Sequence, residues 1–167
     1  VYGPPSTGGT RDALAELILG KGCEASAPEI KAIKDSDKDA YDARCLRIRE
    51  DGAYIDAGEN DNLIVQKLQS NPNAIGVFGY SYLEENKTRV NGVPISGVTP
   101  AYGTIASGEY PGARPLFLYV KKAHLAAIPG LQRFLVEYAE LWGPEGPLVR
   151  RGLIAAPEAS RARSAAI

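Results

Sequence analysis

The sequence has 167 residues, of which 44% are hydrophobic and 23% charged, and its formal net charge is −1. This composition is typical of a globular protein with a substantial core, and it gives no general electrostatic basis for binding nucleic acid or an anionic membrane. No apolar run reaches the roughly 18 residues that a membrane span needs. No signal peptide is recognisable and the chain begins with Val1, so its start is expected to be a processed or truncated end.

The first predicted elements are a short strand, a small polar loop and a helix. Residues 1–3 are extended in character, and Pro4 and Pro5 disfavour an early helix. Residues 13–19 carry apolar side chains at helical spacing, which predicts an amphipathic helix that residues 20–22 end with two glycines.

The loop before this helix has the residues of an anion site. The first N–H groups of a helix lack partners within it, and the helix dipole places partial positive charge there. Gly8 and Gly9 allow a ligand to approach and supply N–H groups, Thr10 offers a hydroxyl, and Arg11 offers a planar guanidinium. The alternative is that this loop is only a helix cap and turn. It lacks both the Gly-Lys-Ser/Thr of a P-loop and the spaced glycines of a dinucleotide-binding loop.

Cys23 and Cys45 are the two cysteines of the chain. They flank predicted helical segments, so a disulfide between helices is predicted, which would imply an oxidising compartment. Two buried free thiols are the alternative. Two thiols without Cys-x-x-Cys spacing do not make a structural zinc site, and no metal or other cofactor is predicted.

Helices are predicted next over residues 28–33 and 38–50, with residues 35–37 offering a cap, and a strand over 53–57. A second strand–loop–helix junction follows, and its helix spans residues 63–68. Asn60 or Asp61 is predicted to cap that helix, and both are weak candidates for direct contact with an anion.

The remaining elements alternate between extended and helical patterns. Residues 74–78 form an apolar run that predicts a buried strand and lead to a short helix over 83–87. Residues 89–98 are expected to be extended around a turn at Asn91-Gly92, and a short helix is expected up to residue 107.

Residues 115–120 are the most strand-like run in the chain. The aromatic and leucine side chains at helical spacing from Leu131 to Trp142 predict a helix that buries one face, and a last short helix is expected over 148–152. The tail after Pro157 is expected to fray or form a surface helix. His124, the one histidine, is expected at the surface, and with no second histidine it supports neither a metal site nor a Ser-His-Asp triad.

Several stretches together resemble the phosphate-binding proteins of bacterial phosphate ABC importers. They include Tyr-Gly-Pro-Pro followed by Gly-Thr-Arg-Asp-Ala near the start, Arg-Glu-Asp-Gly-Ala-Tyr, Ala-Gly-Glu-Asn-Asp-Asn-Leu and Gly-Val-Phe-Gly-Tyr-Ser, and they cover residues 1–5, 9–13, 48–54, 57–68, 75–81, 110–111, 114–120 and 152–154. The resemblance implies an α/β fold of the type II periplasmic-binding-protein kind. Residues 1–85 would form one complete lobe that binds the anion. Residues 86–167 would be the returning C-terminal part of the other lobe, whose N-terminal portion this chain lacks.

The resemblance also assigns residues. The family's Ser-Gly-Thr triplet falls on Gly8-Gly9-Thr10, so one hydroxyl is absent, and Thr7 or the weaker candidate Ser6 could supply it. Many relatives have an arginine upstream of the triplet, where this chain has Pro4-Pro5, which leaves Arg11 as the available cation. The family's acidic residue that accepts a proton from phosphate has no matching position here.

The predicted function is therefore capture of inorganic phosphate outside the cytoplasmic membrane, in the periplasm, and delivery to the permease of an ABC importer. No covalent chemistry or catalytic residue is needed, and a separate N-terminal segment is a possible further partner. The alternatives are an enzyme acting on phosphate esters, with the same loop holding the transferred group, and an interaction module that pairs through an open sheet edge.

Overall fold

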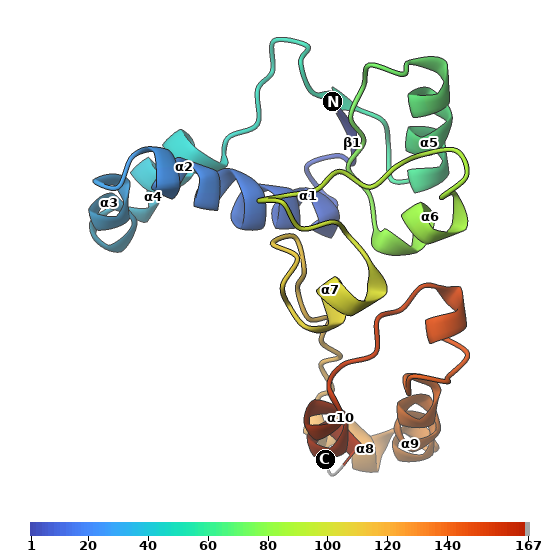
Figure 1. Ribbon diagram of the computed structural model, residues 1–167. Helices are drawn as coiled ribbons and strands as arrows, with labels where there is room; N and C mark the ends of the chain where they lie inside the picture. The colour runs from blue at the N-terminus through green and yellow to red at the C-terminus, as the bar shows by residue number, and fades with distance from the viewer. Residues whose placement is uncertain (166–167) are drawn as a thin grey trace. The chain divides into compact units, whose positions relative to one another are not determined.

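The computed structural model describes residues 1–165 (Figure 1). The chain divides into two compact units, Val1–Thr99 and a second that begins at Pro100. This division falls later than the lobe boundary predicted at residue 85, and the assignment of the two segments to lobes stays a prediction.

The first unit is built on three parallel extended segments. Strand β1 (Tyr2–Gly3) pairs in parallel with β2 (Ile55–Asp56), with Tyr2 opposite Ile55. On its other side, the Tyr2 N–H donates to the Ile75 carbonyl and the Val77 N–H donates to the Tyr2 carbonyl, both at 2.8 Å. Strand β1 is therefore central, and both crossovers of this unit start from the carboxyl ends of parallel segments.

The first crossover begins with one uninterrupted helical run. It consists of α1 (Gly9–Ala13), the π-helix η1 (Leu14–Gly20) and α2 (Lys21–Ser26). The predicted helix end at residues 20–22 is wrong, because Lys21 keeps helical angles of φ −66° and ψ −39°. Gly20 is instead the site of a close approach: a Cβ there would lie 2.9 Å from Tyr41 Oη and 3.0 Å from Leu46 Cδ2.

The crossover continues through α3 (Ile30–Ser36), α4 (Lys38–Tyr41) and the π-helix η2 (Asp42–Leu46). Asp37 caps α4 by accepting the Ala40 N–H at 3.0 Å, as predicted. The helix predicted to reach residue 50 ends at Leu46, where Arg47 turns to an extended conformation (φ −69°, ψ 123°).

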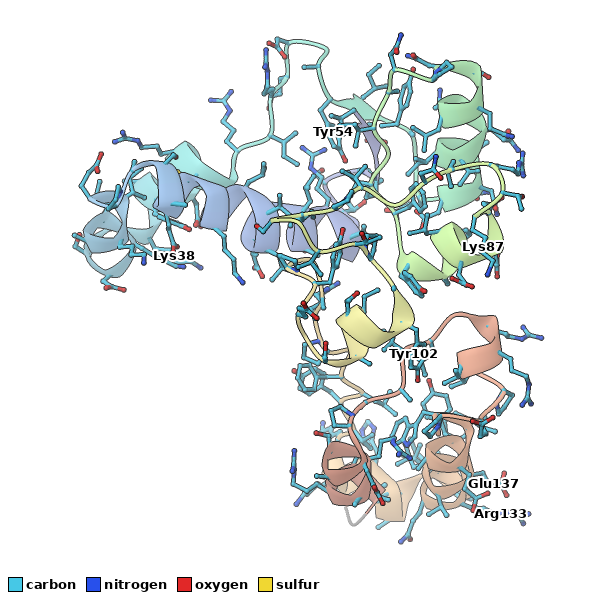
Figure 2. The ribbon with its side chains drawn as sticks, in the orientation of Figure 1. Lys38, Tyr54, Lys87, Tyr102, Arg133 and Glu137 are labelled. Carbon is cyan, nitrogen blue, oxygen red and sulfur yellow. A yellow bond between two sulfur atoms is a disulfide. The ribbon has the colours of Figure 1, made fainter. Side chains whose placement is uncertain are left out.

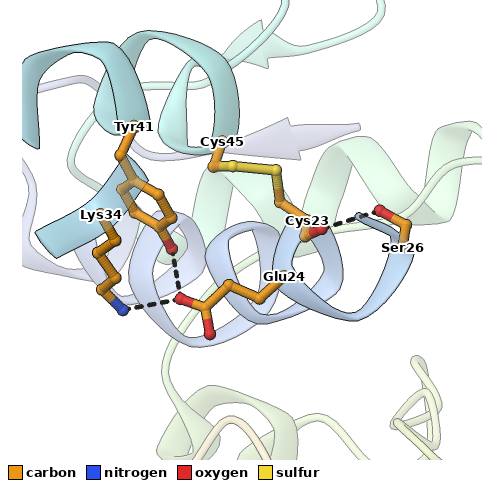
Figure 3. The surroundings of a disulfide bond; sticks show 6 residues. All are labelled: Cys23, Glu24, Ser26, Lys34, Tyr41 and Cys45. Atoms are coloured by element: carbon orange, nitrogen blue, oxygen red, sulfur yellow. Dashed lines mark hydrogen bonds and ion pairs between the residues drawn. A yellow bond between two sulfur atoms is a disulfide. The ribbon is translucent and has the colours of Figure 1, made fainter. Parts of the chain in front are cut away.

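The predicted disulfide between Cys23 and Cys45 is confirmed, with the two Cα atoms 5.5 Å apart (Figure 3). It belongs to a small core of Ile30, Tyr41 and Cys45. Figure 3 also shows Lys34 and Tyr41 directed at Glu24, whose Oε1 accepts a hydrogen bond of 2.8 Å from each. The disulfide and this polar cluster hold α2 against α3, α4 and η2.

The second crossover is α5 (Asp61–Ser70), which buries Ile64 and Val65. It packs closely on the extended segment beyond it, since a Cβ at Gly76 would lie 2.7 Å from Leu68 Cδ1 and 3.0 Å from Ile64 Cγ2. Helix α6 (Tyr80–Glu85) then starts earlier than the predicted residue 83.

The turn predicted at Asn91-Gly92 lies elsewhere. Ile95 and Val98 form an antiparallel bridge, and the two residues between them, Ser96 and Gly97, have φ values of 53° and 80°. Positive φ at both central residues is the geometry of a tight hairpin turn, which glycine adopts readily.

The second unit is helical. Its elements are α7 (Tyr102–Ala106), α8 (Lys122–Ala127), α9 (Leu131–Leu141), the 3₁₀ turn η3 (Val149–Arg151) and α10 (Glu158–Ala165). Helix α9 contacts α8 and α10, and the Tyr102 hydroxyl accepts the N–H of the buried Ala155 at 3.3 Å. Arg133 and Glu137 form an ion pair of 2.7 Å on α9 and lie side by side in Figure 2.

Two expectations for this unit are wrong. Residues 115–120 form no strand, and Phe117 and Tyr119 are 70% and 88% exposed. The stripe on α9 is not a buried core face: among the described residues α9 has no buried side chain, and Phe134 is 57% exposed. Its rings instead pack on one another, with Phe134 stacked on Tyr138 and Tyr138 edge-on to Trp142. Within residues 1–165, no helix has both the length and the apolar content to cross a bilayer.

Candidate anion-binding site

The loops that carry the predicted site residues lie at one edge of the first unit. They follow β1, β2 and the segment around Gly76, which run parallel, so their carboxyl ends share an edge. From β1 the chain crosses over to β2, which lies on one side of β1. From β2 it crosses through α5 to the segment around Gly76, which lies on the other side of β1. Ligands of open α/β sheets bind where strand order reverses in this way.

Helix α1 begins at Gly9, and the residue at its N-cap position is a glycine. Gly8 is the buried N-cap, with φ −88° and ψ 129°, and no side chain makes a cap hydrogen bond there. The N–H groups of Arg11 and Asp12 donate to the Gly8 carbonyl at 2.9 and 3.4 Å, which closes the first turn. The Gly8 N–H itself donates to the Pro5 carbonyl at 3.0 Å, so this amide is directed at the protein, contrary to its expected role as an anion donor.

Arg11 is held beside this N-terminus by an aromatic ring. Its guanidinium lies over Tyr54, 4.9 Å from the ring centroid, within the range of a cation–π interaction. The Tyr54 hydroxyl donates to the Pro4 carbonyl at 2.6 Å, and a Cβ at Gly3 would overlap the Tyr54 side chain. Partial burial raises the pKa of Tyr54 against the opposing effect of Arg11, so Tyr54 stays a neutral donor. Sequence reasoning missed Tyr54, whose strand-like context carries no signal of this contact.

Thr7 and Glu59 connect the loop after β1 to the loop after β2. The Thr7 hydroxyl donates to Glu59 Oε1 at 2.8 Å, across 52 positions of the sequence. Glu59 was not predicted as a site residue. Ser6 and Arg11 both line a neighbouring cavity of about 370 Å³, together with Asp12, Ala15, Glu16, Asp42, Leu46, Arg47, Ile48 and Glu50.

The weak candidates lie at the start of α5. Asn60 caps this helix by accepting the Asn62 N–H at 3.0 Å, as predicted. Asp61 Oδ2 accepts a long hydrogen bond of 3.4 Å from the Gly79 N–H, which connects it to the third loop of the edge. Burial raises the pKa of Asp61, the Gly79 N–H opposes that shift, and the charge of Glu59 reinforces it.

His124 is exposed on α8, as expected. In the part of the chain that the structure describes, no group of three or more His, Cys, Asp or Glu side chains is placed to hold a metal ion.

The class of protein follows from the family comparison. Residues 1–139 match the model described as a PBP superfamily domain, and the chain belongs to this superfamily. Its mixed α/β first unit fits that assignment.

The curated relatives include phosphate-binding proteins, which confirms the resemblance. The chain is 32% identical over 139 residues to phosphate-binding protein PstS of Staphylococcus saprophyticus, covering 80% of this chain and 34% of the relative. It is 31% identical over 162 residues to PstS of Staphylococcus haemolyticus, covering 94% and 42%. It is 36% identical over 74 residues to protein SphX of Synechococcus elongatus, covering 41% and 22%. The chain thus spans less than half the length of these relatives, and no solved structure gives a significant match.

Proposed function

We propose that this chain is the anion-binding part of an extracytoplasmic solute-binding protein that captures inorganic phosphate and delivers it to the permease of an ABC importer. The observation that carries the proposal is the start of α1, which has no side-chain cap and lies next to the Arg11 guanidinium. The names of the relatives, phosphate-binding proteins, point to the same ligand.

Thr10 and Arg11 are the principal donors in this proposal. Thr10 offers an N–H at the helix N-terminus and a hydroxyl, and Arg11 offers charge-assisted hydrogen bonds. Gly8 and Gly9 belong to the proposed site as the backbone at the helix start, and Thr7 contributes its hydroxyl when it is released from Glu59. Ser6, Asn60 and Asp61 are peripheral members, which contact the anion only at the edge of the site.

The two-lobed arrangement is part of the same proposal. Residues 1–85 would form the lobe that carries the site, and residues 86–167 would contribute to the other lobe, with a further N-terminal segment completing it. Closure of two lobes would bury the anion, and reopening would release it to the permease. No step requires covalent chemistry or a catalytic side chain.

Isothermal titration of the chain with phosphate and with sulfate tests the proposal. We expect phosphate to bind and sulfate to bind more weakly. The Arg11→Gln variant should bind phosphate about ten- to hundredfold more weakly, because a hydrogen bond to a charged group contributes about 1.5–3 kcal/mol. Arg133→Gln removes a guanidinium from the exposed ion pair on α9 and is the matched control, with affinity unchanged. Binding of neither anion, or equal binding of both, contradicts a phosphate receptor.

A further inference from the structure

Glu59 places a carboxylate at the entrance of the proposed anion site. One of its oxygens, Oε1, accepts the Thr7 hydroxyl at 2.8 Å. The other, Oε2, would lie 3.5 Å from a Cβ built at Gly8, the N-cap of α1. Oε1 is thus held by Thr7, and Oε2 lies beside the turn that leads into the helix.

This carboxylate has no salt-bridge partner among the described residues. It accepts the Thr7 hydroxyl and lies beside Gly8, the N-cap of α1, where the helix dipole favours negative charge. These are the groups that an incoming oxyanion would use. The negative charge of Glu59 also acts on Asp61 at the start of α5, where it adds to the rise in the pKa of Asp61 that burial causes.

We infer that Glu59 is a built-in competitor for the anion, which holds the Thr7 hydroxyl in the unliganded chain and weakens the binding of oxyanions in proportion to their charge. The inference rests on the proposed function. An anion that takes the Thr7 hydroxyl must displace the Glu59 carboxylate, and it binds against the repulsion of that carboxylate as long as the loop after β2 stays in place.

The competition has a direct consequence for selectivity. Sulfate carries two negative charges, whereas phosphate below its second pKa carries two protons and one negative charge, so at such a pH Glu59 penalises sulfate more. An exposed carboxylate is also screened by salt, so the penalty falls as ionic strength rises.

The test is titration of the full chain and its Glu59→Gln variant with inorganic phosphate and with sulfate, at low salt and at a fixed pH below the second pKa of phosphate. Gln keeps the shape and the acceptor oxygen that Thr7 needs but removes the charge. We expect Glu59→Gln to bind both anions about fivefold or more tightly than the unaltered chain, as expected for one partly screened charge, with the larger gain for sulfate. The gain should shrink in high salt.

Glu140→Gln is the matched control, because Glu140 is an exposed residue of α9 and the substitution changes the net charge by the same amount. Its affinities should equal those of the unaltered chain. If the unaltered chain binds phosphate and Glu59→Gln binds it equally or more weakly, the inference is overturned while the proposed function stands. If neither chain binds either anion, both are overturned.

Discussion

The Glu24 side chain accepts hydrogen bonds from residues on two other helices of the first crossover. Glu24 accepts hydrogen bonds from Lys34 and Tyr41, and its side chain is only 17% exposed. These bonds, that of Lys34 first, hold the pKa of Glu24 below its ordinary value, whereas burial raises the pKa of Tyr41. The cluster is therefore stable with Glu24 ionised and both partners protonated.

The Glu24 cluster predicts an acid-sensitive helix. A carboxyl group whose pKa is lower in the folded state stabilises that state above its unfolded pKa, and the contribution is lost as the pH falls through the folded value. Glu24→Gln should therefore reduce the protection of α3 amides from hydrogen exchange at neutral pH. The difference from the unaltered chain should vanish as the pH falls well below 4.5, the ordinary pKa of a glutamate.

The control for this experiment is Glu109→Gln, which removes a carboxylate from the second unit and should leave α3 protection unchanged at every pH. A Glu24→Gln difference that is constant across the acid range would show that the ionised state of Glu24 does not matter.

At the scale of elements, two glycines in one helical run, Gly20 and Gly22, differ in what surrounds them. The sequence predicts that these glycines end a helix, but both lie within the helical run of η1 and α2. Gly20 lets η1 approach Tyr41 and Leu46 of the neighbouring helices, whereas nothing lies within 4 Å of a Cβ at Gly22. The same residue type thus serves packing at one position and serves no visible contact at the other.

Alanine substitutions at these two glycines form a matched pair of variants. Gly22→Ala should stabilise the chain by about 0.5–1 kcal/mol, because glycine inside a helix is unfavourable by that amount. Gly20→Ala should destabilise it by about 1 kcal/mol, since overpacking exceeds the gain in helix propensity. Urea denaturation followed by circular dichroism measures both. An equal stabilisation by the two variants would refute the close packing at Gly20.

At the scale of the whole molecule, the described chain leaves a β-prone apolar run uncovered. Leu116, Phe117, Leu118 and Tyr119 are each more than half exposed. Such a run, with high β-propensity and no charge, favours association between chains. This feature favours the alternative of an interaction module.

Phe117→Lys should reduce concentration-dependent association, measured by light scattering over a dilution series. The thermal midpoint should change little, since the substituted side chain is exposed. Gln132→Lys on exposed α9 adds the same charge without removing an apolar ring, and it should leave association unchanged. Equal association of all three chains would show that residues 116–120 are not the contact surface.

Local signals were sufficient for much of the fold. Asn60 and Asp37 cap helices within three residues of themselves, and α5 follows from apolar periodicity. The Cys23–Cys45 disulfide followed from two cysteines beside helices. The strand predicted at 115–120 failed because a strand needs a neighbour to pair with, and propensity alone does not supply one.

The sequence by itself determined the family, the order of the crossover elements in the first unit and the disulfide, because each depends on residues close in the chain or on a recognisable motif. Only the tertiary structure decided that Gly20 lies inside a helix, that Tyr54 holds Arg11 and that Glu59 holds Thr7. The last two contacts join the loop after β1 to residues around β2, and no local pattern encodes which side chains meet when parallel strands bring distant loops to one edge.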